Sequence, residues 1–167
     1  MAKALLITNK DLLTYTNLSG NIDRTKITQY IGIAQDIHIQ SDLGTDLLEK
    51  IQADIIASNL TGNYLTLVRT WVKPALIHWS AVEMLPMLSV TVGNGGIFQH
   101  TPENGSPLPK EEVDSLASKE EEYAKFYSDR LRTYLCNNSE LFPEYNTNTN
   151  EDINPSKDDL NSCNWVL

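Results

Sequence analysis

The chain has 167 residues, within the size of a single domain, and it is 41% hydrophobic and 21% charged, which excludes a wholly disordered or fibrous chain. Its formal net charge of −9 makes free nucleic acid a poor partner, because the surface repels a phosphate backbone. The two cysteines, Cys136 and Cys163, are fewer than small secreted folds usually carry and favour a reducing, intracellular environment.

Residues 4–7 form the one apolar run near the start of the chain, and it is too short for the core of a signal peptide. No stretch approaches the roughly 18 apolar residues that cross a bilayer. We therefore expect neither an export signal nor a role in the membrane.

The first helix is predicted to begin at Asp23, because apolar residues then recur at offsets of three and four up to about residue 41. The side chain of Asp23 is expected to cap it. Leu43 and Gly44 form a tight junction, and the hydroxyl of Thr45 is expected to cap a second helix with the same apolar spacing. The pattern therefore predicts two helices that meet at Gly44.

A third, central helix is predicted from Asn63, its expected cap, to about Leu85. Pro74 lies inside it and lacks a backbone N–H, so a kink or a restart is expected there. Trp71 and Trp79 lie on either side of Pro74, and both are expected to help bury this helix.

Residues 90–100 break the helical pattern and predict a β-hairpin. Two short apolar runs flank residues 93–96, Gly-Asn-Gly-Gly, and Asn-Gly favours a type I′ turn because both central residues need positive φ. Ile97, Phe98 and His100 are predicted to lie at a subunit or ring interface, since the turn places apolar groups beyond the helical body. The alternative is that the hairpin folds back onto its own bundle.

A fourth helix of about seven turns is predicted from residue 110 to about residue 137. Its aromatic residues indicate packing on an internal or subunit face rather than base stacking, because few basic residues flank them. These aromatic residues are Tyr123, Phe126, Tyr127 and Tyr134. Lys125, Arg130 and Arg132 either meet an acidic neighbour or belong to a solvated surface.

Residues 138–167 lose periodicity and are rich in Asn and acidic residues, which is typical of an arm that orders on a partner. Fully extended, such an arm reaches on the order of 100 Å. Its predicted contact residues at the start are Leu141, Phe142 and Tyr145, and those at the end are Trp165, Val166 and Leu167. The alternative is a disordered, solubilising tail.

The predicted fold class is therefore mainly α. Residues 1–137 are expected to form a bundle of about four helices, with one β-hairpin near residues 90–100 between the third and fourth helices. Residues 138–167 are expected to form an extended C-terminal arm.

No pattern points to catalysis or to a bound metal. The histidines His38, His78 and His100 are far apart, and neither His-Glu-x-x-His nor paired Cys-x-x-Cys occurs. His38 lies on an apolar helix face, where a hydrogen-bonded core histidine is commoner than a metal ligand. Residues 93–96 lack the Gly-Lys-Ser/Thr ending of a phosphate loop. We therefore predict no enzyme activity, no catalytic residue, no cofactor and no metal site.

Residues 31–40 (Ile-Gly-Ile-Ala-Gln-Asp-Ile-His-Ile-Gln) and 42–48 (Asp-Leu-Gly-Thr-Asp-Leu-Leu) resemble the opening of head-to-tail connector proteins of tailed bacteriophages. The likeness continues through residues 64–76 to Leu85-Pro86, and then through residues 94–97 to a long helix with an acidic start. The sequence is most similar to the ring, or adaptor, proteins of crAss-like phages. The likeness covers about residues 20–137, and the arm departs from it.

This resemblance implies a structural virion protein that forms a ring, commonly of twelve copies, in the neck below the portal. Such a ring links capsid to tail and lets the packaged DNA pass through its lumen, and its subunits assemble in the cytoplasm of the bacterial host. The implied partners are further copies of the chain, the portal protein and adjacent neck or tail ring proteins, with no membrane. A negative lumen would keep DNA from adhering.

Two other classes of function remain open at this point. A cellular helical protein-interaction module predicts a monomer or dimer and no ring. A small hydrolytic or metal enzyme requires a cleft with converging polar groups, for which the sequence offers no pattern.

Overall fold

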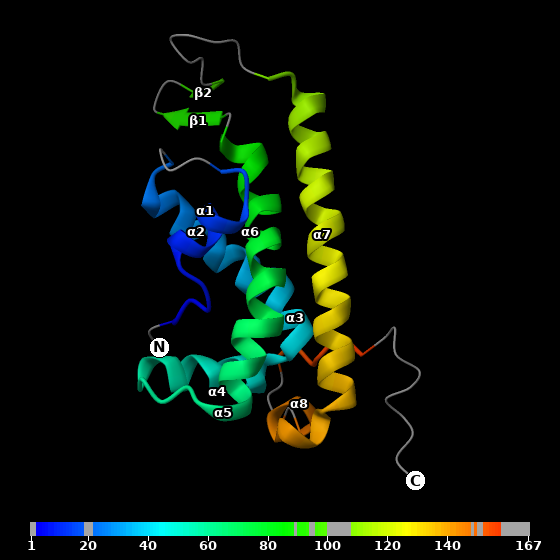
Figure 1. Ribbon diagram of the computed structural model, residues 1–167. Coiled ribbons are helices and arrows are strands. Elements are labelled where there is room, and N and C mark those ends of the chain that lie inside the picture. Colours follow the sequence, from blue (N-terminus) through cyan, green and yellow to red (C-terminus); the bar gives the residue numbers. More distant parts are fainter. Residues whose placement is uncertain are drawn as a thin grey trace.

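The computed structural model in Figure 1 describes residues 3–18, 22–88, 90–93, 96–99, 108–147, 149 and 152–157. This part of the chain is mainly helical, which confirms the predicted fold class. Within it, no helix is both long and apolar enough to cross a membrane. The elements are α1 (Asn9–Tyr15), α2 (Arg24–Ala34), the π-helical turn η1 (Gln35–Ile39), α3 (Gln40–Leu43), α4 (Thr45–Ile56), α5 (Gly62–Thr66), the π-helical turn η2 (Leu67–Val72), α6 (Lys73–Leu88), β1 (Val90–Gly93), β2 (Gly96–Gln99), α7 (Lys110–Asn137), the 3-10 turn η3 (Ser139–Leu141) and α8 (Pro143–Thr147).

Asp23 caps α2 as predicted, since its carboxylate accepts a hydrogen bond from the backbone N–H of Thr25 at 2.7 Å. The helix continues through η1 and α3 and ends at Gly44, whose φ of 79° favours glycine. The predicted cap at Thr45 is wrong. Gly44 occupies the cap position, because the Thr45 hydroxyl is engaged elsewhere: it accepts a hydrogen bond from the backbone N–H of Ile153 at 3.1 Å.

The third helix runs from Gly62 to Leu88 as α5, η2 and α6. The predicted cap at Asn63 is wrong by two residues, because Thr61 occupies the cap position. The helix does not restart at Pro74. Instead, the π-helical turn η2 contains Thr70, the residue whose carbonyl the Pro74 ring would crowd in a regular α-helix.

Figure 1 shows α6 and α7 side by side and antiparallel, with α1 and α2 on the other side of α6. The hydrophobic core fills the space between these helices and α4. Its largest fully buried side chains are Leu12, Ile27, Ile31, Ile39, Leu43, Leu47, Ile51, Leu67, Leu76, Met84, Phe142 and Tyr145. Trp71 and Trp79 pack against this core and stay partly exposed.

β1 and β2 lie beyond the end of α6 (Figure 1) and pair antiparallel, with Val90 opposite Gln99 and Gly93 opposite Gly96. Apart from Val90, which is half-buried, only the backbone of these two strands is described. The predicted interface at Ile97 and Phe98 therefore stays a prediction, and His100 lies outside the described residues.

α7 spans 28 residues and ends at Asn137, where the sequence predicted its end. Cys136 in its last turn is disulfide-bonded. A disulfide does not fit the reducing environment that the low cysteine count favours.

The prediction of a separate arm from residue 138 is wrong for residues 139–157 as far as the structure describes them. η3 and α8 fold back onto the helical body, and the Phe142 and Tyr145 side chains are 0% and 1% exposed. Residues 152–157 continue along α3 and α4: the backbone N–H of Thr45 donates to the carbonyl of Ile153 at 3.0 Å, and that of Ser156 donates to the carbonyl of Ser41 at 2.8 Å. Two buried aromatic rings outweigh the polar composition of this segment.

Candidate interaction site

Helix α7 has one buried face and one exposed apolar flank. The buried face packs against α6 and α3 and carries Ala124, Ser128, Leu131 and Leu135. The flank carries Leu116, Tyr123 and Phe126, which are 50%, 43% and 57% exposed. A row of large apolar side chains left in solvent along one helix marks a surface for contact with another molecule.

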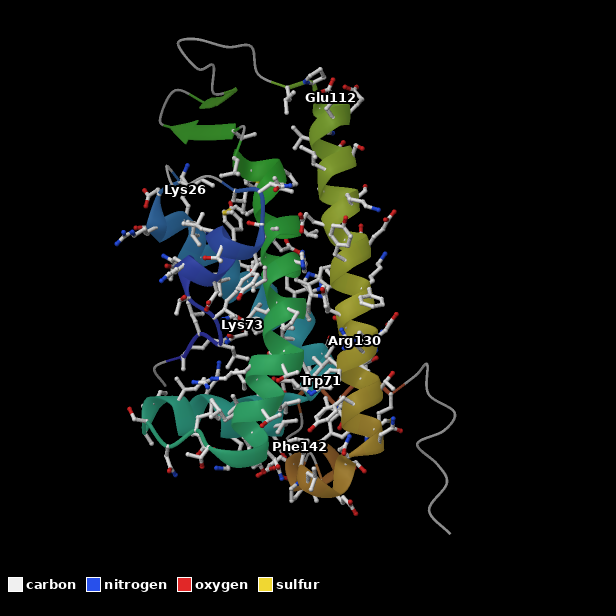
Figure 2. The ribbon with its side chains drawn as sticks, viewed as in Figure 1. Lys26, Trp71, Lys73, Glu112, Arg130 and Phe142 are labelled. Atoms are coloured by element: carbon white, nitrogen blue, oxygen red, sulfur yellow. The ribbon has the colours of Figure 1, made fainter. Side chains whose placement is uncertain are left out.

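Arg130 lies at the centre of an aromatic cluster on the same flank. Its guanidinium carbon is 5.2 Å from the centre of the Trp71 ring, 5.7 Å from Phe126 and 6.0 Å from Tyr127. Trp71 in turn stacks on Tyr134, with ring centres 4.5 Å apart. Figure 2 shows Trp71 and Arg130 on adjacent helices. Arginine over exposed aromatic rings is the composition of interface hot spots.

Two cavities are lined by residues of this cluster. One, of ≈ 400 Å³, lies between Trp71, Phe126 and Arg130. The other, of ≈ 410 Å³, lies between Tyr15, Arg69 and Tyr127. Arg130 of the first cavity lies 6.0 Å from the ring centre of Tyr127, which lines the second. We call the two cavities together the aromatic groove, and its principal residues are Tyr15, Arg69, Trp71, Lys73, Phe126, Tyr127, Arg130 and Tyr134.

Lys73 joins the groove to α1. Its ammonium lies 2.6 Å from Asp11 Oδ1 and 5.7 Å from the centre of the Tyr15 ring. Burial raises the pKa of Asp11, but hydrogen bonds from Lys73 and Thr8 outweigh burial and lower this pKa below its ordinary value. The carboxylate therefore stays charged and holds Lys73 in place.

His78 and His38 both pair with a glutamate from another helix. His78 Nδ1 lies 2.6 Å from Glu120 Oε2, and its ring stacks on Tyr127 in the groove. His38 Nε2 lies 2.9 Å from Glu83 Oε1, which confirms that His38 is hydrogen-bonded within the fold. These pairs tie α6 to α7 and η1, so both imidazoles have a structural role.

His38 also stacks on Trp79, with ring centres 3.7 Å apart. The indole Nε1–H of Trp79 donates to Ser128 Oγ at 3.0 Å. This contact fixes Trp79 between η1 and the buried face of α7.

The three basic residues of α7 for which an acidic neighbour or a solvated surface is predicted, Lys125, Arg130 and Arg132, have different surroundings. Arg132 lies 3.1 Å from Asp42, a carboxylate with a side chain only 5% exposed. Burial raises the pKa of Asp42, and Ser128 and Arg132 oppose that shift. Lys125 pairs with Glu121 on the solvated surface. Arg132 thus meets an acidic group inside its own chain, whereas Arg130 faces the aromatic groove.

The predicted contact residues of the C-terminal arm have three different outcomes. Phe142 and Tyr145 are wrong as partner contacts, because both are buried in the core of their own chain. Phe142 packs edge-on against Tyr64, with ring centres 5.4 Å apart. Leu141 is 37% exposed and stays a prediction. The three terminal residues, Trp165, Val166 and Leu167, lie outside the described residues.

The aromatic groove as a whole was not predicted. The aromatic pattern predicts an internal or subunit face for Phe126, Tyr127 and Tyr134 of the fourth helix. No sequence pattern predicts a contact role for Tyr15, Arg69 or Lys73. They come from α1 and from the segment around Pro74, and only the packing of α1 and α7 on either side of α6 brings them to Tyr127. A capping box of Thr8 and Asp11 was the available sequence signal for α1.

Among the residues that the structure describes, no group of three or more His, Cys, Asp or Glu side chains is arranged to hold a metal ion.

Comparison with protein families matches residues 39–155 of the chain to the model of one family, described as "Family of unknown function (DUF6712)". Comparisons with curated proteins and with solved structures give no significant match. The matched region runs from the end of η1 to residue 155, so it includes η2, α6 and α7 of the aromatic groove but not α1.

Proposed function

The chain belongs to the DUF6712 family of unknown function, and from this premise we propose that it is a structural virion protein that forms a ring. The ring lies in the head-to-tail connector below the portal, links capsid to tail and lines the DNA passage. The specific place in the virion rests on the resemblance of residues 20–137 to connector proteins of tailed bacteriophages.

The observation that carries an assembly function is the exposed apolar flank of α7 with its aromatic groove. Phe126 is 57% exposed although it is one of the largest apolar residues of the helix. Burial of such a side chain contributes about 1.5–3 kcal/mol, so leaving it in water favours association with another protein surface. Arg130 over the Trp71 ring adds the residue types that dominate the binding energy of interfaces.

The finer architecture belongs to the same proposal. The two-stranded element of β1 and β2 forms a hairpin that extends beyond the bundle toward an adjacent ring or the portal. The aromatic groove faces a neighbouring subunit. The net charge of −9 gives the lumen a negative surface, from which DNA is repelled.

Electron microscopy and mass measurement of the purified full-length chain test the ring. We expect closed rings of uniform copy number, with twelve copies as the number that the resemblance implies. A monomer or dimer at every concentration tested contradicts the proposal and favours the alternative, a cellular helical interaction module.

Location in the virion needs a separate measurement. A reconstruction of purified particles should place density for this fold between the portal and the tail. Antibody labelling confined to capsid faces or tail fibres, or absence of the chain from purified particles, contradicts the connector assignment.

A further inference from the structure

The cavity between Tyr15, Arg69 and Tyr127 has the size and the composition of a small-molecule site. Its volume of ≈ 410 Å³ falls within the range of about 300–1,000 Å³ that is typical of such sites. Pro74 and Ile77 of α6 give it an apolar lining. The two tyrosine rings come from α1 and α7, which lie on either side of α6 in Figure 1. A ligand in this cavity therefore meets aromatic rings from two helices that are far apart in the sequence.

Both rings are held by groups that have a partner of their own. Tyr127 stacks on His78, with ring centres 5.3 Å apart, and His78 Nδ1 lies 2.6 Å from Glu120 Oε2. The ammonium of Lys73 lies 5.7 Å from the centre of the Tyr15 ring. The walls of the cavity are thus in place before a ligand binds, which lowers the entropic cost of binding.

Arg69 gives the cavity its uncompensated positive charge. Lys73 also lines the cavity, but its ammonium lies 2.6 Å from the carboxylate of Asp11. Within the described part of the chain, no ion pair joins Arg69 to a carboxylate, although the formal net charge of the chain is −9. One uncompensated cation matches the single charge of a carboxylate better than a phosphate monoester, which carries about −1.5 to −2 at pH 7.

The third helix sets the spacing between this charge and the apolar lining. Arg69, Lys73 and Ile77 recur every four residues, the spacing that places side chains on one helix face, and all three line the cavity. Arg69 belongs to the π-helical turn η2, a kind of turn that is frequent at functional sites. The lining from Arg69 to His78 covers about 13 Å along the helix axis, which is long enough for a carboxylate and an aromatic ring.

We propose that this cavity binds a small aromatic carboxylate. The carboxylate pairs with the guanidinium of Arg69. The aromatic ring of the ligand lies over Pro74 and Ile77 and contacts the rings of Tyr15 and Tyr127. The site goes beyond the proposed ring function and does not depend on it, because every residue that lines the cavity belongs to one copy of the chain.

Titration of the full-length chain with 3-phenylpropionate, followed by two-dimensional NMR of the backbone amides, tests the site. We expect saturable shifts centred on Arg69, Ile77 and Tyr127, with a dissociation constant on the order of 1 mM for an acid of this size. The neutral analogue 3-phenylpropionamide should bind about tenfold more weakly, because it cannot form the charge-assisted contact with Arg69. Equal binding of acid and amide, absence of saturable binding, or shifts confined to another part of the chain overturns the proposal.

The variant Arg69→Gln removes the charge and keeps a polar side chain. It should weaken binding of 3-phenylpropionate about tenfold and leave binding of 3-phenylpropionamide unchanged, a difference that a merely structural role of Arg69 would not produce. Lys26→Gln removes the same charge from α2, at a distance from Lys73 in Figure 2, and should leave both constants unchanged. Equal weakening by the two variants indicates unspecific attraction of anions and overturns the proposal.

The contribution of the aromatic rings needs its own measurement. Tyr15→Ser should weaken binding of 3-phenylpropionate about fivefold through the lost ring contact, and the chain should stay folded because the Tyr15 side chain is 63% exposed. Acetate and inorganic phosphate, which carry no ring, should bind at least about tenfold more weakly than 3-phenylpropionate. Equal binding of these anions indicates a general anion site and overturns the proposal. If circular dichroism shows that Arg69→Gln does not fold, the comparison of acid and amide on the unchanged protein decides.

Discussion

In residues 139–147 and on the outer flank of α7, the burial of the aromatic side chains is the opposite of what the composition of each segment predicts. Residues 139–147 are mostly polar, yet Phe142 and Tyr145 are among the most buried side chains of the protein. The flank of α7 has the aromatic spacing of a core helix, yet Phe126 is 57% exposed. Burial therefore depends on which segment lies opposite a side chain, and the groups that stabilise this fold are distinct from those offered to a partner.

The largest expected effect is a loss of stability, measured by comparing Phe142→Ala with Phe126→Ala. Phe142→Ala should lower the free energy of unfolding by about 3–5 kcal/mol, because it empties a fully buried site against Tyr64. Phe126→Ala should change it by about 0.5 kcal/mol or less, since the ring is mostly in solvent. Urea unfolding of both variants makes the comparison, and equal losses would show that the flank of α7 belongs to the core.

The junction between α3 and α4 tests how firmly residues 152–157 are attached. A Cβ at position 44 would lie 2.7 Å from Pro155 Cδ, and Gly44 has φ 79° and ψ 160°, a region essentially restricted to glycine. Gly44→Ala should therefore cost about 1–3 kcal/mol of unfolding free energy.

The same variant should also speed hydrogen exchange at the Thr45 amide, which donates to the carbonyl of Ile153. Gly32→Ala is the matched control, because its Cβ would lie 3.9 Å from Leu5 Cδ2, an ordinary contact inside a helix, and should stabilise by about 0.5–1 kcal/mol. Unchanged exchange at Thr45 in Gly44→Ala would mean that Pro155 does not hold this junction.

The smallest effect concerns Tyr64, whose hydroxyl donates to Glu144 Oε2 at 2.7 Å and so ties the third helix to α8. Burial and this hydrogen bond raise the pKa of Tyr64 from 10.0 to about 12. The folded state therefore holds the proton more tightly than the unfolded state. The stabilisation is complete below pH 10 and is lost as the pH rises toward about 12.

Tyr64→Phe should lower the unfolding free energy by about 1 kcal/mol at pH 8. It should also reduce the decline between pH 10 and 12, the interval of the shifted pKa. Part of the decline remains, because burial raises the pKa of Tyr145 to about 12 as well. Urea unfolding at pH 8, 10 and 11.5 measures both effects, and parallel pH profiles for the two proteins would exclude the Tyr64 contact.

Local patterns were sufficient for the positions of the main helices. The cap at Asp23, the glycine junction at Gly44 and the end of α7 at Asn137 follow from periodicity, capping and turn chemistry within a few residues of each site. Thr45 shows where this reasoning stops. Its hydroxyl is a good cap by local rules, but residues about a hundred positions away engage it instead.

The sequence by itself determined a mainly helical, acidic protein and the approximate bounds of its long helices, because helix formation depends on spacing and capping along the chain. The tertiary structure alone decided that Phe142 is core and Phe126 is surface, that Lys73 meets Asp11, and that Arg69 and Tyr127 line one cavity. Each of these outcomes depends on which distant segments pack together, and the burial of side chains between them has no signature in the local pattern.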